Sequence, residues 1–167
     1  MVSRIEKYLI FDLDGTLISG DSLQETIIEF LKKNIFNAVK IPFMLFKGKA
    51  NFKTKLANEI LIEPQNFDFS KEVVSLIKEK KNLGYKIILC SGSHQKQLSL
   101  VAEKLNYFDY VFGTSENINL KGIRKIKFIK KYIDLDTFSY VGNSTDDIEI
   151  WNESEEAFFI NKNIFFK

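Results

Sequence analysis

Cysteine, histidine and proline are scarce in this chain of 167 residues, which holds one cysteine, one histidine and two prolines. A single cysteine, Cys90, excludes an intramolecular disulfide and a zinc site built on cysteines. The first apolar run is interrupted by Asp12 and Asp14, which is not the pattern of a signal peptide. We therefore expect a reducing, cytoplasmic location, with peripheral attachment to a membrane as an alternative.

Charge of one sign is missing from two stretches of the chain, although the net charge is only +2. Leu31–Lys55 holds seven lysines and no acidic residue, and Lys121–Lys131 holds five lysines and Arg124, again without an acid. Such patches favour anionic partners, while a solvated helix face is the simpler interpretation of each. We expect no nucleic-acid partner.

Short apolar runs alternate with segments of helical period along most of the chain. The runs predict five β-strands, at Tyr8–Phe11, Tyr85–Cys90, Tyr110–Phe112, Phe138–Val141 and Ala157–Ile160. Apolar residues three and four apart predict helices at Lys71–Leu83, Gln95–Leu105 and Ile123–Ile133. This alternation predicts an α/β fold, a Rossmann-like three-layer arrangement around a parallel sheet, with its ligand site at the carboxyl ends of the strands.

One region departs from this alternation and predicts a small helical cap inserted after the first strand. The helical stretch runs over Asp21–Glu63, so we place the core at residues 1–18 and 68–167 and the cap at 19–67. Its middle, Ile35–Phe46, has nine apolar residues in twelve, too few for a bilayer span of about 20. It could form the core of the cap, a membrane-surface element or a self-association surface.

Two carboxylates follow the first predicted strand. Asp12 and Asp14 are two residues apart, so on an extended strand both side chains point to the same side, and Gly15 then releases the chain into a loop. Two such charges repel unless a cation neutralises them, and Mg²⁺ prefers oxygen ligands of this kind. A carboxylate can also act as a nucleophile toward phosphorus. A pair of solvated turn residues is the alternative.

The other strand ends supply groups that suit a phosphate. Ser91-Gly92-Ser93 offers a hydroxyl and backbone amides before a helix, which is a typical phosphate cradle. Lys121 follows the third strand and can place an ammonium group on phosphoryl oxygens. The fourth strand ends in Gly142–Asp147, "GNSTDD", with further oxygen ligands. Parallel strands bring these four ends to one edge of the sheet.

Taken together, these segments resemble the four motifs of the haloacid dehalogenase-like superfamily in its phosphatase form. "FDLDGTL" is similar to the first motif, Ser91 to the second, Lys121 to the third and "GNSTDD" to the fourth, in the family's order. Lys121–Gly122 precedes Asn143 by 22 residues, as in the phosphoserine-phosphatase-like branch. "NLKG" and "YVGNS" with the aspartate and tryptophan that follow resemble domains fused to polyprenyl-phosphate transferases.

The resemblance implies a role for each matching residue. Asp12 would attack phosphorus and form an aspartyl-phosphate, and Asp14 would act as general acid and then general base. Ser91 and the Gly92 amide would bind the transferring phosphoryl oxygens. Lys121 would neutralise charge and hold Asp12. The acid at Asp14 favours phosphoryl transfer over cleavage of a carbon–halogen bond.

The resemblance also implies a magnesium site, with one departure from the family pattern. Asp12 and the backbone carbonyl of Asp14 would bind Mg²⁺. Asn143 stands where the family usually has an aspartate ligand, so its amide oxygen brings no charge and metal affinity should fall. We expect Asp147 to hold Lys121 or a metal-bound water and not to bind the metal directly.

Four further residues receive narrower expectations. Thr16 would orient the loop or the nucleophile on the substrate-binding side. Asp21 is either a substrate contact at the cap entrance or the N-cap of the first cap helix, since "DSLQE" is typical of a helix start. We expect His94 to be structural or exposed, and Lys125 to lie on a solvated helix face.

The function implied is a Mg²⁺-dependent phosphomonoester hydrolase acting on a small or lipid-linked phosphorylated substrate, with possible membrane-surface contact through the cap. A phosphomutase or phosphotransferase with the same nucleophile is one alternative, and a non-catalytic binding module is another. A cap of this size would close over the substrate and exclude water. The sequence does not indicate an oligomeric state.

Overall fold

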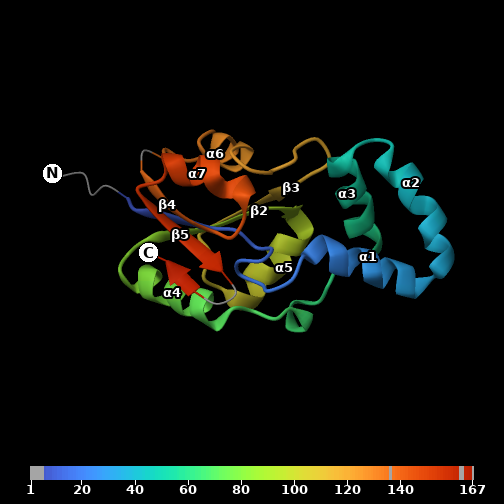
Figure 1. Ribbon diagram of the computed structural model, residues 1–167, viewed down its shortest axis with the longest axis horizontal. Coiled ribbons are helices and arrows are strands. Elements are labelled where there is room, and N and C mark those ends of the chain that lie inside the picture. Colours follow the sequence, from blue (N-terminus) through green and yellow to red (C-terminus); the bar gives the residue numbers. More distant parts are fainter. Residues whose placement is uncertain (1–5, 136, 162–163, 167) are drawn as a thin grey trace.

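A computed structural model describes residues 6–135, 137–161 and 164–166, and these form a six-stranded sheet with helices on both faces (Figure 1). The strand order is β3-β2-β1-β4-β5-β6. The strands span β1 (Tyr8–Phe11), β2 (Lys86–His94), β3 (Tyr110–Thr114), β4 (Phe138–Gly142), β5 (Glu156–Asn161) and β6 (Ile164–Phe166). Strands β1 to β5 are parallel, and β6 runs antiparallel to β5.

The central strand β1 is buried along its whole length between β2 and β4. Its last residue, Phe11, pairs with Leu89 on one side and with Val141 on the other. The next amide, that of Asp12, still donates to the carbonyl of Val141 at 3.0 Å. The backbone that carries Asp12 is therefore held by the most protected part of the sheet.

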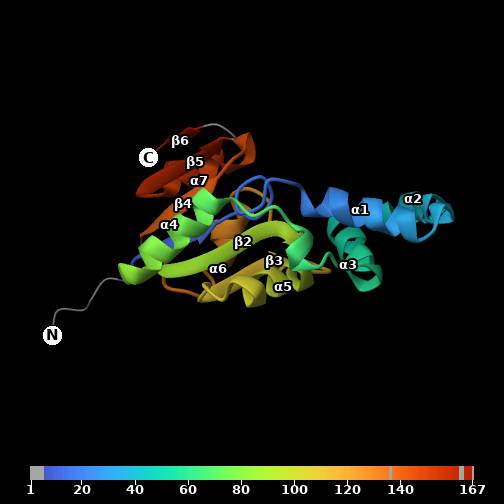
Figure 2. The same cartoon turned by 90° about the horizontal axis from the view of Figure 1, so that it is seen from below.

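Alternating side chains of β1 supply two separate apolar layers, which makes the molecule three layers deep. Leu9 and Phe11 pack toward the cluster that includes Val73 of α4 and Leu98 of α5. Ile10 packs on the other face, in the cluster that includes Ile126 of α6. The helices span α4 (Lys71–Asn82), α5 (Gln95–Leu105), α6 (Arg124–Ile129) and α7 (Ile148–Glu153). Figure 1 shows α6 and α7 on one side of the sheet and α4 and α5 on the other, and Figure 2 views the sheet from the side of α4 and α5.

The chain between β1 and α4 is helical and extends to one side of the sheet (Figure 1). It contains α1 (Ser22–Lys33), a 3₁₀ segment (Ile35–Val39), α2 (Lys40–Leu45), α3 (Lys49–Glu59) and a 3₁₀ turn (Pro64–Asn66). We call residues 22–59 the helical insertion. It has a small apolar core of its own, made of Phe30, Met44, Phe52 and Leu56. In the described part of the chain, no helix combines the length and apolar content needed to cross a bilayer.

The predicted α/β class and parallel sheet are confirmed, and β1 and α5 have the predicted bounds. Strand β2 is longer than expected, because a bulge between Cys90 and His94 lets the chain keep pairing with β3. The helix predicted to reach Ile133 ends as α6 at Ile129, where hydrogen bonds tighten to the three-residue step, as from Tyr132 N to Ile129 O. Strand β6 was not predicted. The cap boundaries at 19 and 67 stay a prediction.

Candidate active site

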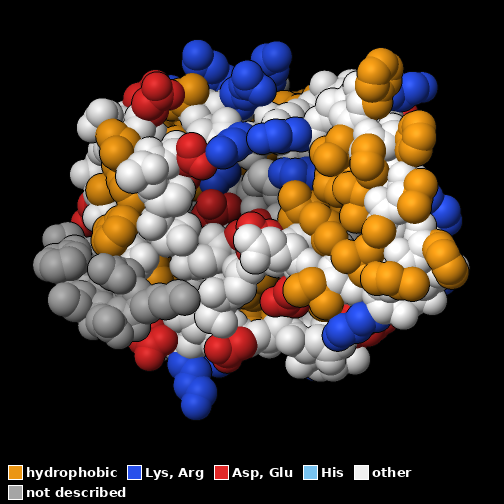
Figure 3. All heavy atoms as spheres, turned by 45° about the vertical axis from the view of Figure 1, so that its right-hand side comes forward, with side chains coloured by type: hydrophobic (Ala, Val, Ile, Leu, Met, Phe, Trp, Pro, Cys, Tyr) orange, Lys and Arg blue, Asp and Glu red, His pale blue; other side chains and the backbone are white. Residues whose placement is uncertain are grey.

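A cleft of about 860 Å³ lies at the carboxyl ends of the strands, between the sheet and the helical insertion. Asp12, Asp14 and Asn143 line it from the sheet side, while Lys49 and Lys53 line it from α3. Figure 3 shows this hollow with acidic and basic side chains around it and the apolar side chains of the helical insertion beside it. The cleft therefore combines oxygen ligands with cations, as a phosphate site requires.

The Asp12 carboxylate lies at the inner end of the cleft and is 9% exposed. Its Oδ1 accepts a hydrogen bond from the Leu13 amide at 2.8 Å, and its Oδ2 is 2.8 Å from the Lys125 Nζ. Burial raises the pKa of Asp12, and the charge of Lys125 counters part of that rise. The backbone and the ion pair together hold this carboxylate in one orientation.

Lys125 is the centre of a buried polar network on α6 and is 3% exposed. Its Nζ contacts Asp12, the Tyr140 hydroxyl at 2.7 Å and the Asp147 Oδ1 at 3.3 Å. The Tyr140 hydroxyl donates in turn to the Asp147 Oδ1 at 2.8 Å. Burial alone would lower the pKa of Lys125, but Asp12 and Asp147 outweigh it and hold that pKa above its usual range. The lysine is therefore charged at neutral pH.

The prediction that Lys121 holds Asp12 is wrong in this structure, and so is the prediction that Lys125 lies on a solvated face. Lys121 precedes the turn at Gly122, and its Nζ pairs with Asp146 at 2.8 Å, with both side chains more than half exposed. Lys125 shares the inner face of α6 with Ile126 and Ile129. In the sequence, Lys125 lies one and four residues before these isoleucines, and this spacing indicated that it shares their buried face. Lys121 still lines the cleft.

Asp147 is 1% exposed, and its carboxylate binds the backbone of the loop after β4 as well as side chains beside the cleft. Its Oδ2 accepts from the amides of Asn143 and Ser144 at 3.3 Å each, while its Oδ1 serves Tyr140 and Lys125. Asp147 thus holds Lys125, not Lys121 as predicted. A side chain at Gly142 would lie 2.6 Å from the Asp147 Oδ2, which explains the glycine that begins "GNSTDD".

Asn143 and Thr16 join the two loops that follow β1 and β4. The Thr16 hydroxyl donates to the Asn143 Oδ1 at 3.3 Å, and Thr16 is 1% exposed. The Asn143 amide packs on Gly15, whose φ of 67° and close approach leave no room for a side chain. The Thr16 hydroxyl thus orients Asn143 and its loop, which agrees with the predicted orienting role; Thr16 is not among the residues that line the cleft, and its place on the substrate-binding side stays a prediction.

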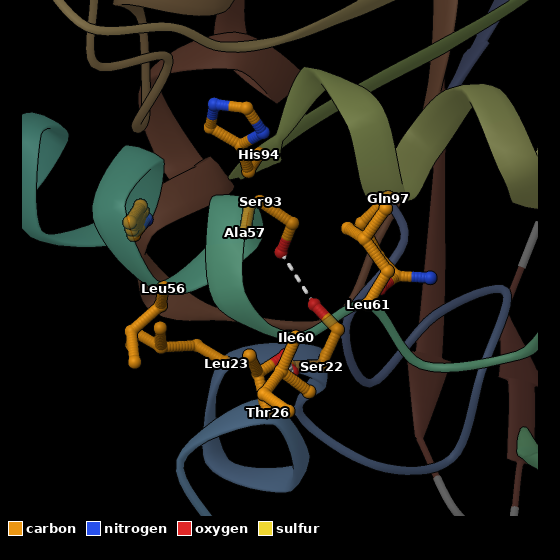
Figure 4. A pocket seen from close by; sticks show the side chains of 11 residues that line it. Ser22, Leu23, Thr26, Leu56, Ala57, Ile60, Leu61, Ser93, His94 and Gln97 are labelled. Atoms are coloured by element: carbon orange, nitrogen blue, oxygen red, sulfur yellow. Dashed lines mark hydrogen bonds between the residues drawn. The ribbon is translucent and has the colours of Figure 1, made fainter. Parts of the chain in front are cut away.

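Asp14 is connected to the helical insertion, which the sequence did not predict. Its Oδ1 accepts from the Ser22 amide, the first of α1, at 2.7 Å, and its Oδ2 accepts from the Ser93 hydroxyl. The hydroxyls of Ser93 and Ser22 lie 2.7 Å apart and point toward each other across the junction of α1 and β2 (Figure 4). The signal for Ser93 was its place two residues after Ser91 on the same strand.

Ser91 and Gly92 line the cleft as predicted, although they belong to the end of β2 and not to a loop. The Ser91 hydroxyl accepts from the Ser93 amide at 3.2 Å. The Gly92 carbonyl accepts from the Thr114 hydroxyl at 2.7 Å and from the Lys53 ammonium. Lys53, which sequence reasoning counted only as part of a basic stretch, thus brings α3 against β2, and burial lowers its pKa.

Two predicted capping or structural residues occupy helix starts. Asp21 is the N-cap of α1, and its Oδ1 accepts from the amides of Leu23 and Gln24 at 2.9 and 3.0 Å. The N-cap alternative is therefore confirmed. Asp21 also lines the cleft, and its contact with a substrate stays a prediction. His94 is the N-cap of α5, where its Nδ1 accepts from the Lys96 amide at 3.3 Å. The structural role expected for His94 is confirmed.

The oxygen donors at the cleft suit Mg²⁺ held jointly by protein, water and substrate. Within residues 6–135, 137–161 and 164–166, no three acidic, histidine or cysteine side chains converge as a metal cluster. Mg²⁺ is commonly bound by one or two carboxylates together with waters and phosphate oxygens. Asp12 supplies a carboxylate, Asn143 an amide oxygen and Asp14 a backbone carbonyl beside the same cleft. This donor set fits that mode of binding.

Comparison with known proteins gives a family and a fold. The model of the haloacid dehalogenase-like hydrolase family matches residues 9–150. An uncharacterised protein of Sinorhizobium fredii is 29% identical over 95% of the chain, which spans 31% of that relative's length. The phosphoserine phosphatase of Methanocaldococcus jannaschii is 24% identical, with 92% of the chain and 84% of the relative covered.

A solved structure gives the same result at the level of the fold. The phospho-aspartyl intermediate analogue of a phosphoserine phosphatase superposes with a TM-score of 0.62. The match has 20% identity and covers 92% of this chain and 86% of that one. At this identity the likeness shows the shared fold.

Proposed function

The chain belongs to the haloacid dehalogenase-like hydrolase family, and from this premise we propose that it is a Mg²⁺-dependent phosphomonoester hydrolase that forms an aspartyl-phosphate. The observation that carries the proposal is the setting of Asp12. A buried carboxylate at the end of the central strand is aligned by Lys125, and a second carboxylate, Asp14, lies two residues away in the same cleft. A nucleophile beside a separate acid and base is what phosphoryl transfer in two steps requires.

In the first step, an Asp12 oxygen attacks phosphorus while the bond from phosphorus to the leaving alcohol breaks. Asp14 gives its proton to the leaving oxygen, so the alcohol departs neutral and Asp14 becomes a carboxylate. Ser91 and the backbone amide of Gly92 bind phosphoryl oxygens at the end of β2. Lys125 keeps its positive charge and orients Asp12, because Asp147 and Tyr140 hold its ammonium in place.

In the second step, water attacks the aspartyl-phosphate and Asp14 takes a proton from it. The bond between Asp12 and phosphorus breaks, which releases inorganic phosphate and restores both carboxyl groups to their starting states. Lys121 and Lys53 both line the cleft and add positive charge where the phosphoryl group accumulates negative charge. The Asp14 contacts with Ser22 and Ser93 hold the acid and base at the boundary with the helical insertion.

Mg²⁺ would be held by the Asp12 carboxylate, the Asp14 carbonyl and the Asn143 amide oxygen. When bound, it neutralises phosphoryl charge and polarises the phosphorus centre. Because Thr16 already donates to the Asn143 oxygen, this ligand is oriented before metal binds. An amide oxygen carries no charge, so the protein should need more Mg²⁺ than a site with an aspartate at this position.

The substrate is a phosphomonoester that is small or carries a lipid. Leu45 and Phe52 line the cleft next to Lys49 and Lys53, so an apolar group can lie beside the phosphate on the insertion side. This arrangement supports a lipid-linked phosphate as well as a small metabolite. A phosphometabolite panel that contains both kinds distinguishes them.

The test is Mg²⁺-dependent release of phosphate from an aryl phosphate by the wild type, Asp12→Asn and Asp14→Asn. We expect Asp12→Asn to lose activity by about 1,000-fold or more and Asp14→Asn by about 100- to 10,000-fold. Both changes keep the side-chain shape, and circular dichroism checks the fold. Equal activity of all three proteins would contradict the mechanism, and activity without a divalent cation would contradict the magnesium assignment. Transfer to an added sugar in place of water would instead identify a phosphotransferase.

A further inference from the structure

Large apolar side chains lie exposed on the outer side of the helical insertion. Phe46 is 92% exposed, Phe36 is 77% exposed and Phe43 is 73% exposed, and Ile35 and Val39 are about two-thirds exposed. We call these five residues the insertion patch. Figure 3 shows apolar side chains gathered over this part of the molecule, next to the hollow of the cleft. An apolar surface of this size on one small element indicates a binding surface.

The insertion patch lies outside the buried apolar core of the insertion. Ile35, Phe36 and Val39 lie on the 3₁₀ segment, Phe43 lies on α2 and Phe46 directly follows α2, and all five side chains are exposed. The inner side of the same segment contributes Met44 to the apolar core that contains Phe30, Phe52 and Leu56. The chain therefore has two apolar faces here, one packed inside and one facing outward.

Lysines surround the insertion patch, and no acidic residue interrupts them. From Phe30 to Asn58 the chain has seven lysines and no aspartate or glutamate. Two of them pair with flanking acids, Lys32 with Glu29 and Lys33 with Glu59. Lys40, Lys47 and Lys49 are exposed, and none of them forms an ion pair in the part of the chain that the structure describes.

We propose that the insertion patch binds the surface of a bilayer that contains anionic lipids. Phenylalanines and aliphatic side chains enter the boundary between head groups and acyl chains, while lysines bind the phosphates of the head groups. Lys40 and Lys47 are exposed and each directly follows a patch residue, Val39 and Phe46, so cationic groups lie near the apolar ones. Exposed apolar groups with exposed lysines nearby in the chain match this surface in both polarity and charge.

The same charges argue against a second copy of the chain as the occupant. A two-fold interface places one patch on an identical patch, so it would bring the exposed Lys40 and Lys47 of both copies close together. The central parts of protein interfaces are also depleted in lysine, whereas anionic membranes attract it. Charge complementarity thus selects the lipid surface.

Docking through the patch would bring the cleft to the membrane. Leu45 is 42% exposed and Lys49 is exposed, and both line the cleft while lying within three residues of Phe46. Membrane binding and catalysis nevertheless use different residues, because no member of the insertion patch lines the cleft. The inference goes beyond the proposed hydrolase and does not depend on it.

The test is co-sedimentation with vesicles of phosphatidylcholine alone and of phosphatidylcholine mixed with phosphatidylglycerol, in the absence of substrate. We expect the wild type to bind the anionic vesicles and to leave the neutral ones largely unbound. Phe46→Ser should weaken binding about tenfold or more, since one buried phenylalanine is lost. Lys40→Gln with Lys47→Gln should weaken it about 25-fold, from a factor of about five for each lysine.

Matched controls lie outside the helical insertion. Leu83→Ser removes a side chain that is 64% exposed at the end of α4, and Lys127→Gln with Lys131→Gln removes two exposed lysines of the second basic stretch. These variants should bind vesicles as the wild type does. Circular dichroism and urea unfolding check that each variant is folded.

Three outcomes would overturn the proposal. The first is no binding of anionic vesicles by the wild type, and the second is equal weakening by the control and patch variants. The third is a concentration-dependent dimer that Phe46→Ser dissolves, since a second copy would then cover the patch. Because vesicle binding is measured without turnover, its failure would leave the hydrolase proposal intact, and the reverse also holds.

Discussion

Charged and apolar side chains are arranged in opposite ways in the sheet and in the helical insertion. Around the sheet, the buried ions Asp12, Lys125 and Asp147 contact one another, and apolar side chains fill a layer on each face. In the insertion, four residues form the buried core, while large apolar side chains and unpaired lysines face outward. In the two proposals made above, the sheet holds the reacting groups, whereas the insertion contacts the membrane surface and part of the substrate.

The two regions meet at Asp14. Its carboxylate accepts from Ser22 at the start of α1 and from Ser93 at the end of β2. Movement of the insertion relative to the sheet would therefore disturb the group that we propose as acid and base, while Asp12 stays anchored by β1 and Lys125. Three predictions test this contrast.

The largest expected difference is in how accessible a thiol is in each region. Cys90 lies fully buried on β2, and burial raises its pKa to about 12, so the reactive thiolate is scarce in the native state. In a Cys90→Ala background, Ala38→Cys puts the only thiol on the exposed side of the insertion. We expect this thiol to react with a thiol reagent at about pH 8 at least about 1,000-fold faster than Cys90.

The sign of the pH effect makes the labelling comparison interpretable. Because the native pKa of Cys90 lies above the value of about 8.5 for an unfolded cysteine, its contribution to stability is fully present below about 8.5 and declines as the pH rises toward 12. Labelling at about pH 8 thus reports opening and not loss of this contribution. Similar rates for the two thiols would mean that β2 protects Cys90 no better than an exposed position is protected, which would contradict the prediction.

The next largest effect separates the two candidate lysines. Lys125→Met leaves Asp12 and Asp147 without their shared cation, so the free energy of unfolding should fall by about 3–5 kcal/mol and kcat/KM by about 100-fold or more. Lys121→Met breaks an exposed pair worth about 0–1 kcal/mol and should lower kcat/KM far less. Urea unfolding and aryl-phosphate kinetics measure both quantities.

The Lys121→Met variant keeps this comparison decisive even if Lys125→Met does not fold. A loss of about 100-fold from Lys121→Met, with stability unchanged, would mean that Lys121 makes the essential contact during turnover. Asp146→Asn serves as the control, since it removes the charged partner of Lys121 and leaves both lysines in place.

The smallest expected effect concerns the connection between the regions. Ser93→Ala removes one of two hydrogen bonds to the Asp14 carboxylate, so kcat should fall about tenfold with little change in stability. Ser22→Ala removes only the hydroxyl contact with Ser93 and keeps the Ser22 amide on Asp14, so its effect should be smaller. If Ser22→Ala cost more than Ser93→Ala, the bond from Ser93 would not be what orients Asp14.

Much of the sheet could be predicted because its signals are local. Tyr8–Phe11 is an uninterrupted apolar run before Asp12, and the period of Gln95–Leu105 matches α5 to the residue. Strand β6 pairs antiparallel at the sheet edge, which the alternation of strands and helices does not indicate. The end of α6 was missed because Ile133 stays in the apolar cluster after the helical hydrogen bonds have changed.

The sequence by itself determined that Asp12, Asp14, Ser91 and the "GNSTDD" loop share one edge of a parallel sheet, because each directly follows an apolar run. Only the tertiary structure decided which lysine reaches Asp12. The turn at Gly122 sends Lys121 outward to Asp146, and the rotation of α6 against the sheet turns Lys125 inward. It likewise decided that Ser93 and Ser22 hold Asp14, because contacts between distant segments depend on packing that no local pattern encodes.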